Sequence, residues 1–106
     1  METRLLQVLR ENGLPEPELQ YEIRSAGAFV ARVDAAFPQW RIAIEYDSDE
    51  HHAGAQAHRR DSSRRNRIYR ASWLPVTATA DDLRNGGGEL CAAIRVARGF
   101  GVSNPS

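Results

Sequence analysis

Residues 30–47, VARVDAAFPQWRIAIEYD, decide the fold of this chain. Two apolar segments flank a turn at Pro38-Gln39-Trp40, and this pattern predicts an antiparallel hairpin with Gln39-Trp40 at its tip. In this hairpin Phe37 pairs with Ile42, Ala35 with Ile44, and Val33 with Tyr46, and these pairs form an apolar face. A register shifted by one residue would set Asp34 beside Ile44 and spoil this face, so the pattern disfavours it.

The other face of this hairpin carries charge. The same register sets Asp34 opposite Glu45, and Arg32 opposite Asp47. Like charges directly opposite one another destabilise a strand pair, so a fold that places them there usually has a cation to bind. Carboxylates suit a hard divalent cation such as Mg²⁺ or Mn²⁺. The residues leave a second interpretation open, in which these carboxylates form only the solvated face of a sheet.

Length and composition indicate one globular domain. The chain has 106 residues, of which 42% are hydrophobic and 26% charged, with a formal net charge of zero. All 14 basic residues are arginine, which excludes lysine as a catalytic base or Schiff-base former.

The lone Cys91 excludes an internal disulfide and lies in an apolar helical run. With neither an apolar signal region nor a membrane-length segment in the sequence, we expect no membrane partner and a cytoplasmic location.

The charges are segregated along the chain. Residues 45–50 hold four acids and no basic residue, whereas residues 59–70 hold six arginines and a single acid, Asp61. An acidic pocket beside a basic helix suits a metal site next to a polyanion. The alternative is an arginine-rich surface helix that only balances the acids.

Apolar periodicity and breakers predict the remaining elements. We expect helices over residues 3–12, 56–71 and 89–98, and strands over 20–24 and 73–77. Pro75 indicates that the last strand lies at an edge or is bulged. The glycines at 86–88 are expected to form a flexible lead into the last helix, and residues 99–106 a frayed tail after a domain spanning residues 1–98.

The helix over residues 56–71 is expected to face the sheet with an unusual stripe. Asp61 and Arg64 share a narrow sector with Ala57, Ile68 and Ala71. Buried opposite charges are normally paired, so an Asp61–Arg64 ion pair is expected, either at the edge of the acidic site or only capping the core. The outward side and flank carry the arginines expected to reach phosphates: Arg59, Arg60, Arg67 and Arg70.

Taken together, these segments resemble the very-short-patch-repair (Vsr)-like endonucleases, an uncharacterised bacterial branch of the restriction-endonuclease-like PD-(D/E)XK superfamily. The resemblance extends from Glu2 to about Arg98. The motifs that carry it are GLPEPELQ (13–20), FVARVDAAFP (29–38), RIAIEYDS (41–48) with His51 after it, RRDSSRRN (59–66) and SWLPVTATADDL (72–83).

The resemblance implies an α/β fold with an αβββαβα core, in which a mixed central sheet is flanked by helices. It further implies that Asp34, Glu45 and Asp47 bind Mg²⁺ or Mn²⁺. His51, and an acid of the first helix that corresponds to Glu2, are the other implied catalytic residues. Arg60, Asp61 and Arg64 match the basic helix motif of the family.

These observations predict a metal-dependent endonuclease that hydrolyses DNA phosphodiester bonds, in repair or phage defence. His51 directly follows the acidic strand, and a histidine there can transfer a proton to or from water. Two other readings stay open: a degenerate nuclease fold that binds nucleic acid or regulates, as in a toxin–antitoxin system, and a purely structural interaction domain. A further domain of a longer chain or a second copy of this chain is the expected protein partner.

Overall fold

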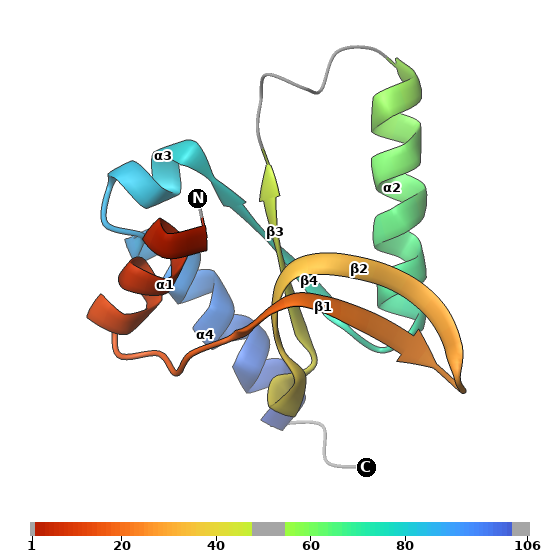
Figure 1. Ribbon diagram of the computed structural model, residues 1–106, viewed down its shortest axis with the longest axis horizontal. Helices are drawn as coiled ribbons and strands as arrows, with labels where there is room; N and C mark the ends of the chain where they lie inside the picture. The colour runs from red at the N-terminus through yellow and green to blue at the C-terminus, as the bar shows by residue number, and fades with distance from the viewer. Residues whose placement is uncertain (1, 48–54, 103–106) are drawn as a thin grey trace.

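The computed structural model describes residues 2–47 and 55–102 as a mixed α/β fold (Figure 1). The described elements, in chain order, are α1 (Glu2–Glu11), β1 (Glu18–Ser25), β2 (Ala28–Phe37), the 3₁₀ helix η1 (Pro38–Trp40), β3 (Ile42–Asp47), α2 (Ala55–Arg70), β4 (Leu74–Thr79), α3 (Ala80–Arg84) and α4 (Gly88–Val102). Helix α4 continues through residues 99–102, which were expected to belong to a frayed tail. Glycine lowers helix propensity without ending a helix, and the first proline after α4 begins is Pro105.

The four strands form one mixed sheet in the order β1-β2-β3-β4. The first three strands pair antiparallel, whereas β3 and β4 run parallel. Parallel neighbours need a long crossover, and α2 supplies it. Pro75 lies on the edge strand β4, as its sequence predicted, because an edge strand tolerates a residue that cannot donate to a neighbour.

The hairpin register is confirmed close to its tip and wrong further from it. Phe37 pairs with Ile42 and Ala35 with Ile44, as expected. Val33, however, packs in the core on the opposite face of the sheet from Ala35. At the same level β1 departs from a regular strand, because Gln20, between the residues that pair with Val33 and Ala35, has a left-handed φ of 50°. The described β2–β3 pairs end at Ala35 and Ile44, so the register expected for a continuous hairpin does not extend to Val33.

Two apolar clusters cover the two faces of the sheet. Helices α1 and α4 pack on one face through residues such as Leu5, Leu9 and Ile94, which bury Phe37 and Ile44. This cluster also buries Cys91, and burial raises the pKa of its thiol, as expected for a structural cysteine. Helix α2 packs on the other face, and Figure 1 shows its N-terminal half extending away from the sheet.

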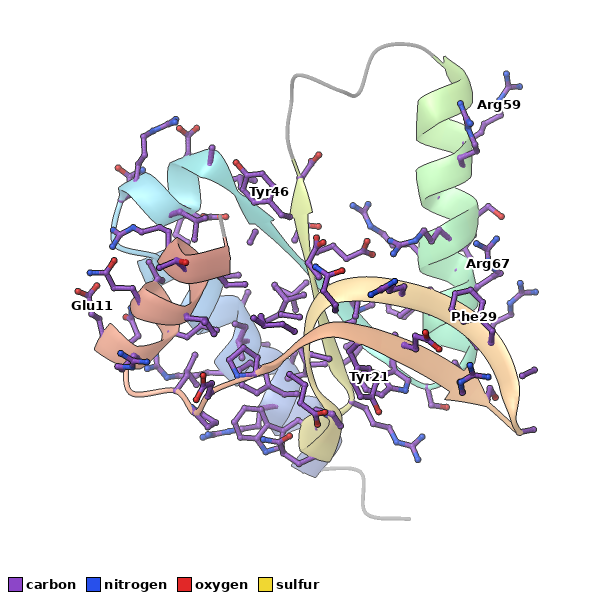
Figure 2. The ribbon with its side chains drawn as sticks, viewed as in Figure 1. Glu11, Tyr21, Phe29, Tyr46, Arg59 and Arg67 are labelled. Atoms are coloured by element: carbon purple, nitrogen blue, oxygen red, sulfur yellow. The ribbon has the colours of Figure 1, made fainter. Side chains whose placement is uncertain are left out.

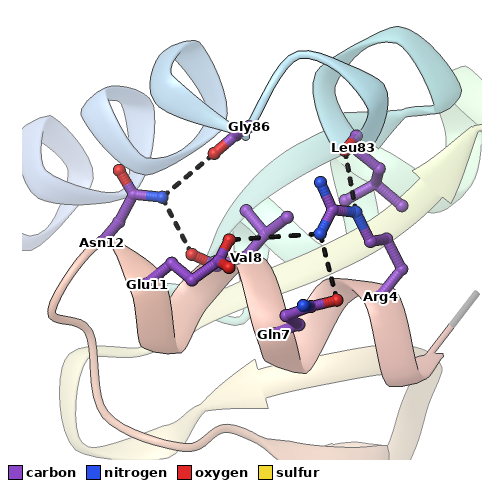
Figure 3. A network of polar contacts seen from close by, with 7 residues as sticks. All are labelled: Arg4, Gln7, Val8, Glu11, Asn12, Leu83 and Gly86. Carbon is purple, nitrogen blue, oxygen red and sulfur yellow. Dashed lines mark hydrogen bonds and ion pairs between the residues drawn. The ribbon is translucent and has the colours of Figure 1, made fainter.

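Helix α1 is fastened to the turn between α3 and α4 (Figure 3). Arg4 donates from Nε to the Leu83 carbonyl at 3.0 Å, and Asn12 donates from Nδ2 to the Gly86 carbonyl at 3.1 Å. Gly87 has a φ of 74°, and a Cβ on it would lie 2.0 Å from Cγ1 of Val8. Gly87, expected to belong to a flexible lead, is therefore packed against α1, because only a residue without a side chain lets Val8 approach this closely.

Candidate functional site

The candidate site begins where β2 and β3 part. The described β2–β3 pairs end at Ala35 and Ile44, and the next contact is made by a side chain instead of the backbone. Oδ2 of Asp34 accepts a hydrogen bond from the Tyr46 N–H at 2.7 Å. Beyond this point β2 stays paired with β1, and β3 with β4. A carboxylate thus caps the junction between two diverging strand pairs.

Arg64 of α2 reaches into this junction. Its guanidinium forms an ion pair with the Glu45 carboxylate and donates a second hydrogen bond to the backbone carbonyl of Arg32. Both side chains of the pair are partly buried, with 31% of Arg64 and 24% of Glu45 exposed. Burial lowers the pKa of Arg64 from its ordinary value, while the charge of Asp34 acts in the opposite direction and Arg67 lowers it further. Glu45 therefore already has a cationic partner within the protein, and Asp34 lies near enough for its charge to act on the same guanidinium.

This arrangement bears directly on the expected metal ion. Among the described residues, no three His, Cys, Asp or Glu side chains are arranged to hold a metal. Asp47 ends β3 opposite Thr79 of β4, and its side chain is partly buried. Arg64 already supplies a positive charge at Glu45, and the assignment of Asp34, Glu45 and Asp47 as metal ligands stays a prediction.

The structure places some of the other candidate residues and not others. Glu2 begins α1, but its side chain lies outside the part of the structure that is described, as does the side chain of Asp61. His51 lies within residues 48–54, also outside the described residues. The expected Asp61–Arg64 pair thus stays a prediction, and the described partner of Arg64 is Glu45.

The expected phosphate-binding arginines lie on the surface of α2. Arg59, Arg60, Arg67 and Arg70 are all exposed, as the helical periodicity predicts. Figure 2 shows Arg59 projecting from the N-terminal part of the helix, away from the sheet. Arg64 was expected both to face the sheet and to bind nucleic acid. In the structure it faces the sheet, where its donors are engaged by Glu45 and Arg32.

The Glu45–Arg64 pair is the feature that sequence reasoning missed. One available signal was the position of Arg64 on the sheet-facing side of α2, together with Ile68, which is fully buried. A half-buried arginine needs an acceptor. In the structure this acceptor is Glu45 of strand β3, whereas the expected acceptor, Asp61, lies on α2 itself.

The comparisons with known proteins give relatives without an assigned function. The uncharacterised proteins MT2308 and Rv2248, from the CDC 1551 / Oshkosh and ATCC 25618 / H37Rv strains of Mycobacterium tuberculosis, are each 42% identical to this chain over 94 residues. The match covers 89% of this chain and 35% of each relative, so the chain spans about a third of their length. No family model and no solved structure matches this chain. In the described residues, no helix is long and apolar enough to cross a membrane.

Proposed function

We propose that this protein is a metal-dependent DNA endonuclease with a restriction-endonuclease-like fold. The observation that carries the proposal is the placement of Asp34 and Glu45 where β2 and β3 part: Asp34 accepts from the N–H of Tyr46, the residue after Glu45, and Glu45 binds Arg64. Two carboxylates from neighbouring strands beside a helix with exposed arginines suit a phosphodiester substrate, whose charge the arginines attract.

The order of the elements supports the same proposal. A helix, three strands, a helix, a strand and a final helix follow one another, with the short α3 added before α4. This order agrees with the αβββαβα core implied by the resemblance. The strand that carries Glu45 and Asp47 is central in the sheet, which gives its side chains a rigid base.

Arg64 occupies one of the two carboxylate oxygens of Glu45, Oε2. Glu45 therefore binds a metal ion either through Oε1 alone or after Arg64 has moved away. Asp34, Glu45 and Asp47 are then the proposed ligands of Mg²⁺ or Mn²⁺. His51 remains the proposed proton-transfer residue.

The direct test is cleavage of supercoiled, mismatched and single-stranded DNA by the purified protein. We expect nicking or cleavage with Mg²⁺ or Mn²⁺ and none with EDTA. Asp34→Asn and Glu45→Gln should each lower the rate by at least roughly 10²-fold, because each removes a ligand charge. Glu16→Gln, which changes an exposed acid between α1 and β1, is the matched control and should cleave normally. Cleavage that persists in EDTA, or in Glu45→Gln, contradicts the proposal.

The same contacts favour one alternative, a degenerate nuclease fold that binds nucleic acid without cutting it. The Glu45–Arg64 ion pair neutralises a carboxylate that catalysis would need. In that case the protein binds DNA, and Mg²⁺ and Mn²⁺ change neither its stability nor the DNA. The cleavage assay, run beside a binding assay, separates the two functions.

A further inference from the structure

The outer side of α2 forms a shallow open depression that the Glu45–Arg64 site does not use. Its described lining residues are Arg59, Ser62, Ser63, Asn66, Tyr69 and Arg70. They recur every three or four residues along the helix, so they form one continuous stripe. The stripe is polar and basic, and it contains one large aromatic side chain.

A second depression adjoins the first, between α2 and the tip of the β1–β2 hairpin. Its described lining residues are Ser25, Phe29, Val30, Arg67, Arg70 and Ala71. Arg70 lines both depressions, so they form one surface, which we call the hairpin–helix surface. Figure 2 shows Phe29 on the hairpin beside the part of α2 that carries Arg67.

The charge of this surface has one sign. Arg59, Arg67 and Arg70 are exposed, and the described lining residues of both depressions include no Asp or Glu. Within the described residues, these three arginines form no ion pair. A ligand that complements the hairpin–helix surface is therefore anionic along its length.

Two aromatic side chains on this surface are left in solvent. Phe29 is 58% exposed and Tyr69 is 53% exposed, although residues of this size normally bury most of their surface. Aromatic rings interleaved with arginines are how proteins bind unpaired nucleotides, because the bases stack on the rings while the phosphates meet the guanidinium groups. In a duplex the faces of the bases are already stacked on one another, so the bases have no free face on which Phe29 and Tyr69 can stack.

We propose that the hairpin–helix surface binds single-stranded nucleic acid. Arg59, Arg67 and Arg70 contact the phosphates, and Tyr69 and Phe29 stack on unpaired bases. The inference rests on the proposed function for its ligand class and extends it by naming a single-stranded segment as the part that is recognised.

The test measures binding without cleavage. Fluorescence anisotropy in EDTA compares a labelled single strand of about 15 nucleotides with the duplex of the same sequence. We expect the single strand to bind more tightly. Tyr69→Ala and Phe29→Ala should each weaken single-strand binding by about 5- to 100-fold and change duplex binding by less than about 2-fold, since each removes one stacking platform.

The matched control is Val96→Ala, which truncates an apolar side chain that is 60% exposed on α4, away from this surface. It should leave both affinities unchanged. All three changes are at exposed positions, and circular dichroism will confirm that the variants fold. Loss of single-strand binding on Tyr69→Ala or Phe29→Ala supports the inference whether or not the protein cleaves DNA.

Other outcomes overturn it in distinguishable ways. If the protein cleaves duplex DNA but the aromatic variants bind single strands normally, the hairpin–helix surface is not the binding site and the proposed nuclease stands. If the unmodified protein binds neither strand form and cleaves neither, both proposals fail.

Discussion

Arg64 and the exposed arginines of α2 have the same guanidinium group and lie on the same helix, yet Arg64 faces the sheet and the others face solvent. Arg64 is partly buried and bound to Glu45 and the Arg32 carbonyl. Arg59, Arg67 and Arg70 are exposed, and among the described residues they have no carboxylate partner. The inward charge is paired within the fold, whereas the outward charges face solvent. Charge count along a helix therefore says little about binding until the side that each residue occupies is known.

The largest expected effect tests how α2 is attached. Ile68 is fully buried and packs against β1, β2 and β3 residues such as Ile23, Val33 and Ala43. Ile68→Ala should lower the free energy of unfolding by about 2–5 kcal/mol, because it leaves a cavity under the helix. Urea denaturation measures this change, and Val96→Ala should stay within about 0.5 kcal/mol of the parent. An equally small change for Ile68→Ala would mean that α2 is held by its charges and not by its apolar contact.

The inward arginine comes next in expected size. Arg64→Gln in EDTA should cost about 1–3 kcal/mol of stability, since it leaves Glu45 partly buried without its cation. Arg84→Gln is the matched control. Arg84 also pairs with an acid, Asp81, but these two side chains are 69% and 74% exposed, and exposed ion pairs contribute little to stability. Equal effects of the two changes would show that the Glu45–Arg64 pair is only a surface contact.

The same variant also tests competition for the carboxylates. If Arg64 takes the place of a metal ion, Arg64→Gln should bind Mn²⁺ more tightly than the parent, and Mn²⁺ should raise its melting temperature more. Calorimetric titration measures the affinity directly. Weaker Mn²⁺ binding by Arg64→Gln than by the parent would contradict competition and would make Arg64 a support of the metal site.

The smallest effects on stability are expected at the outward arginines. Arg67→Gln and Arg70→Gln should leave the free energy of unfolding within about 0.5 kcal/mol of the parent. Each should reduce the slope of log affinity for DNA against log salt by about one, because each removes one phosphate contact. Arg10→Gln on α1, also an exposed arginine, is the control and should keep the full slope. If Arg67→Gln and Arg70→Gln keep the full slope as the control does, the outer side of α2 is a solvated surface that does not contact DNA.

Local patterns predicted the elements other than the short helices η1 and α3, together with part of the register, because burial imposes periodicity on the sequence. The pairs Phe37–Ile42 and Ala35–Ile44 followed from the rule that a slip of one residue exposes an apolar face. The same rule failed at Val33, since it assumes that β2 and β3 stay paired along their length, and the point where they part is not visible in the sequence.

The candidate site was harder to predict than the fold. Its carboxylates come from the hairpin, and sequence reasoning identified Asp34 and Glu45 as neighbours of a shared cation. It identified that cation as a metal, which stays a prediction, and it did not foresee that Arg64, from a helix that follows Glu45 in the chain, binds Glu45. Helical periodicity gives the side of α2 on which Arg64 lies, but it cannot give the strand residue that this side meets.

The hydrogen bond between the Tyr46 N–H and Asp34 gives the molecule an internal spectroscopic reporter. An amide proton held by a carboxylate is sensitive to the charge on that carboxylate, because the bond is charge-assisted. In a ¹⁵N-labelled sample, the Tyr46 cross-peak will therefore register any event that changes the charge around Asp34, whether a cation arrives or Arg64 departs. Occupancy of this junction can thus be followed at one backbone position, without a dye and before any turnover is detectable.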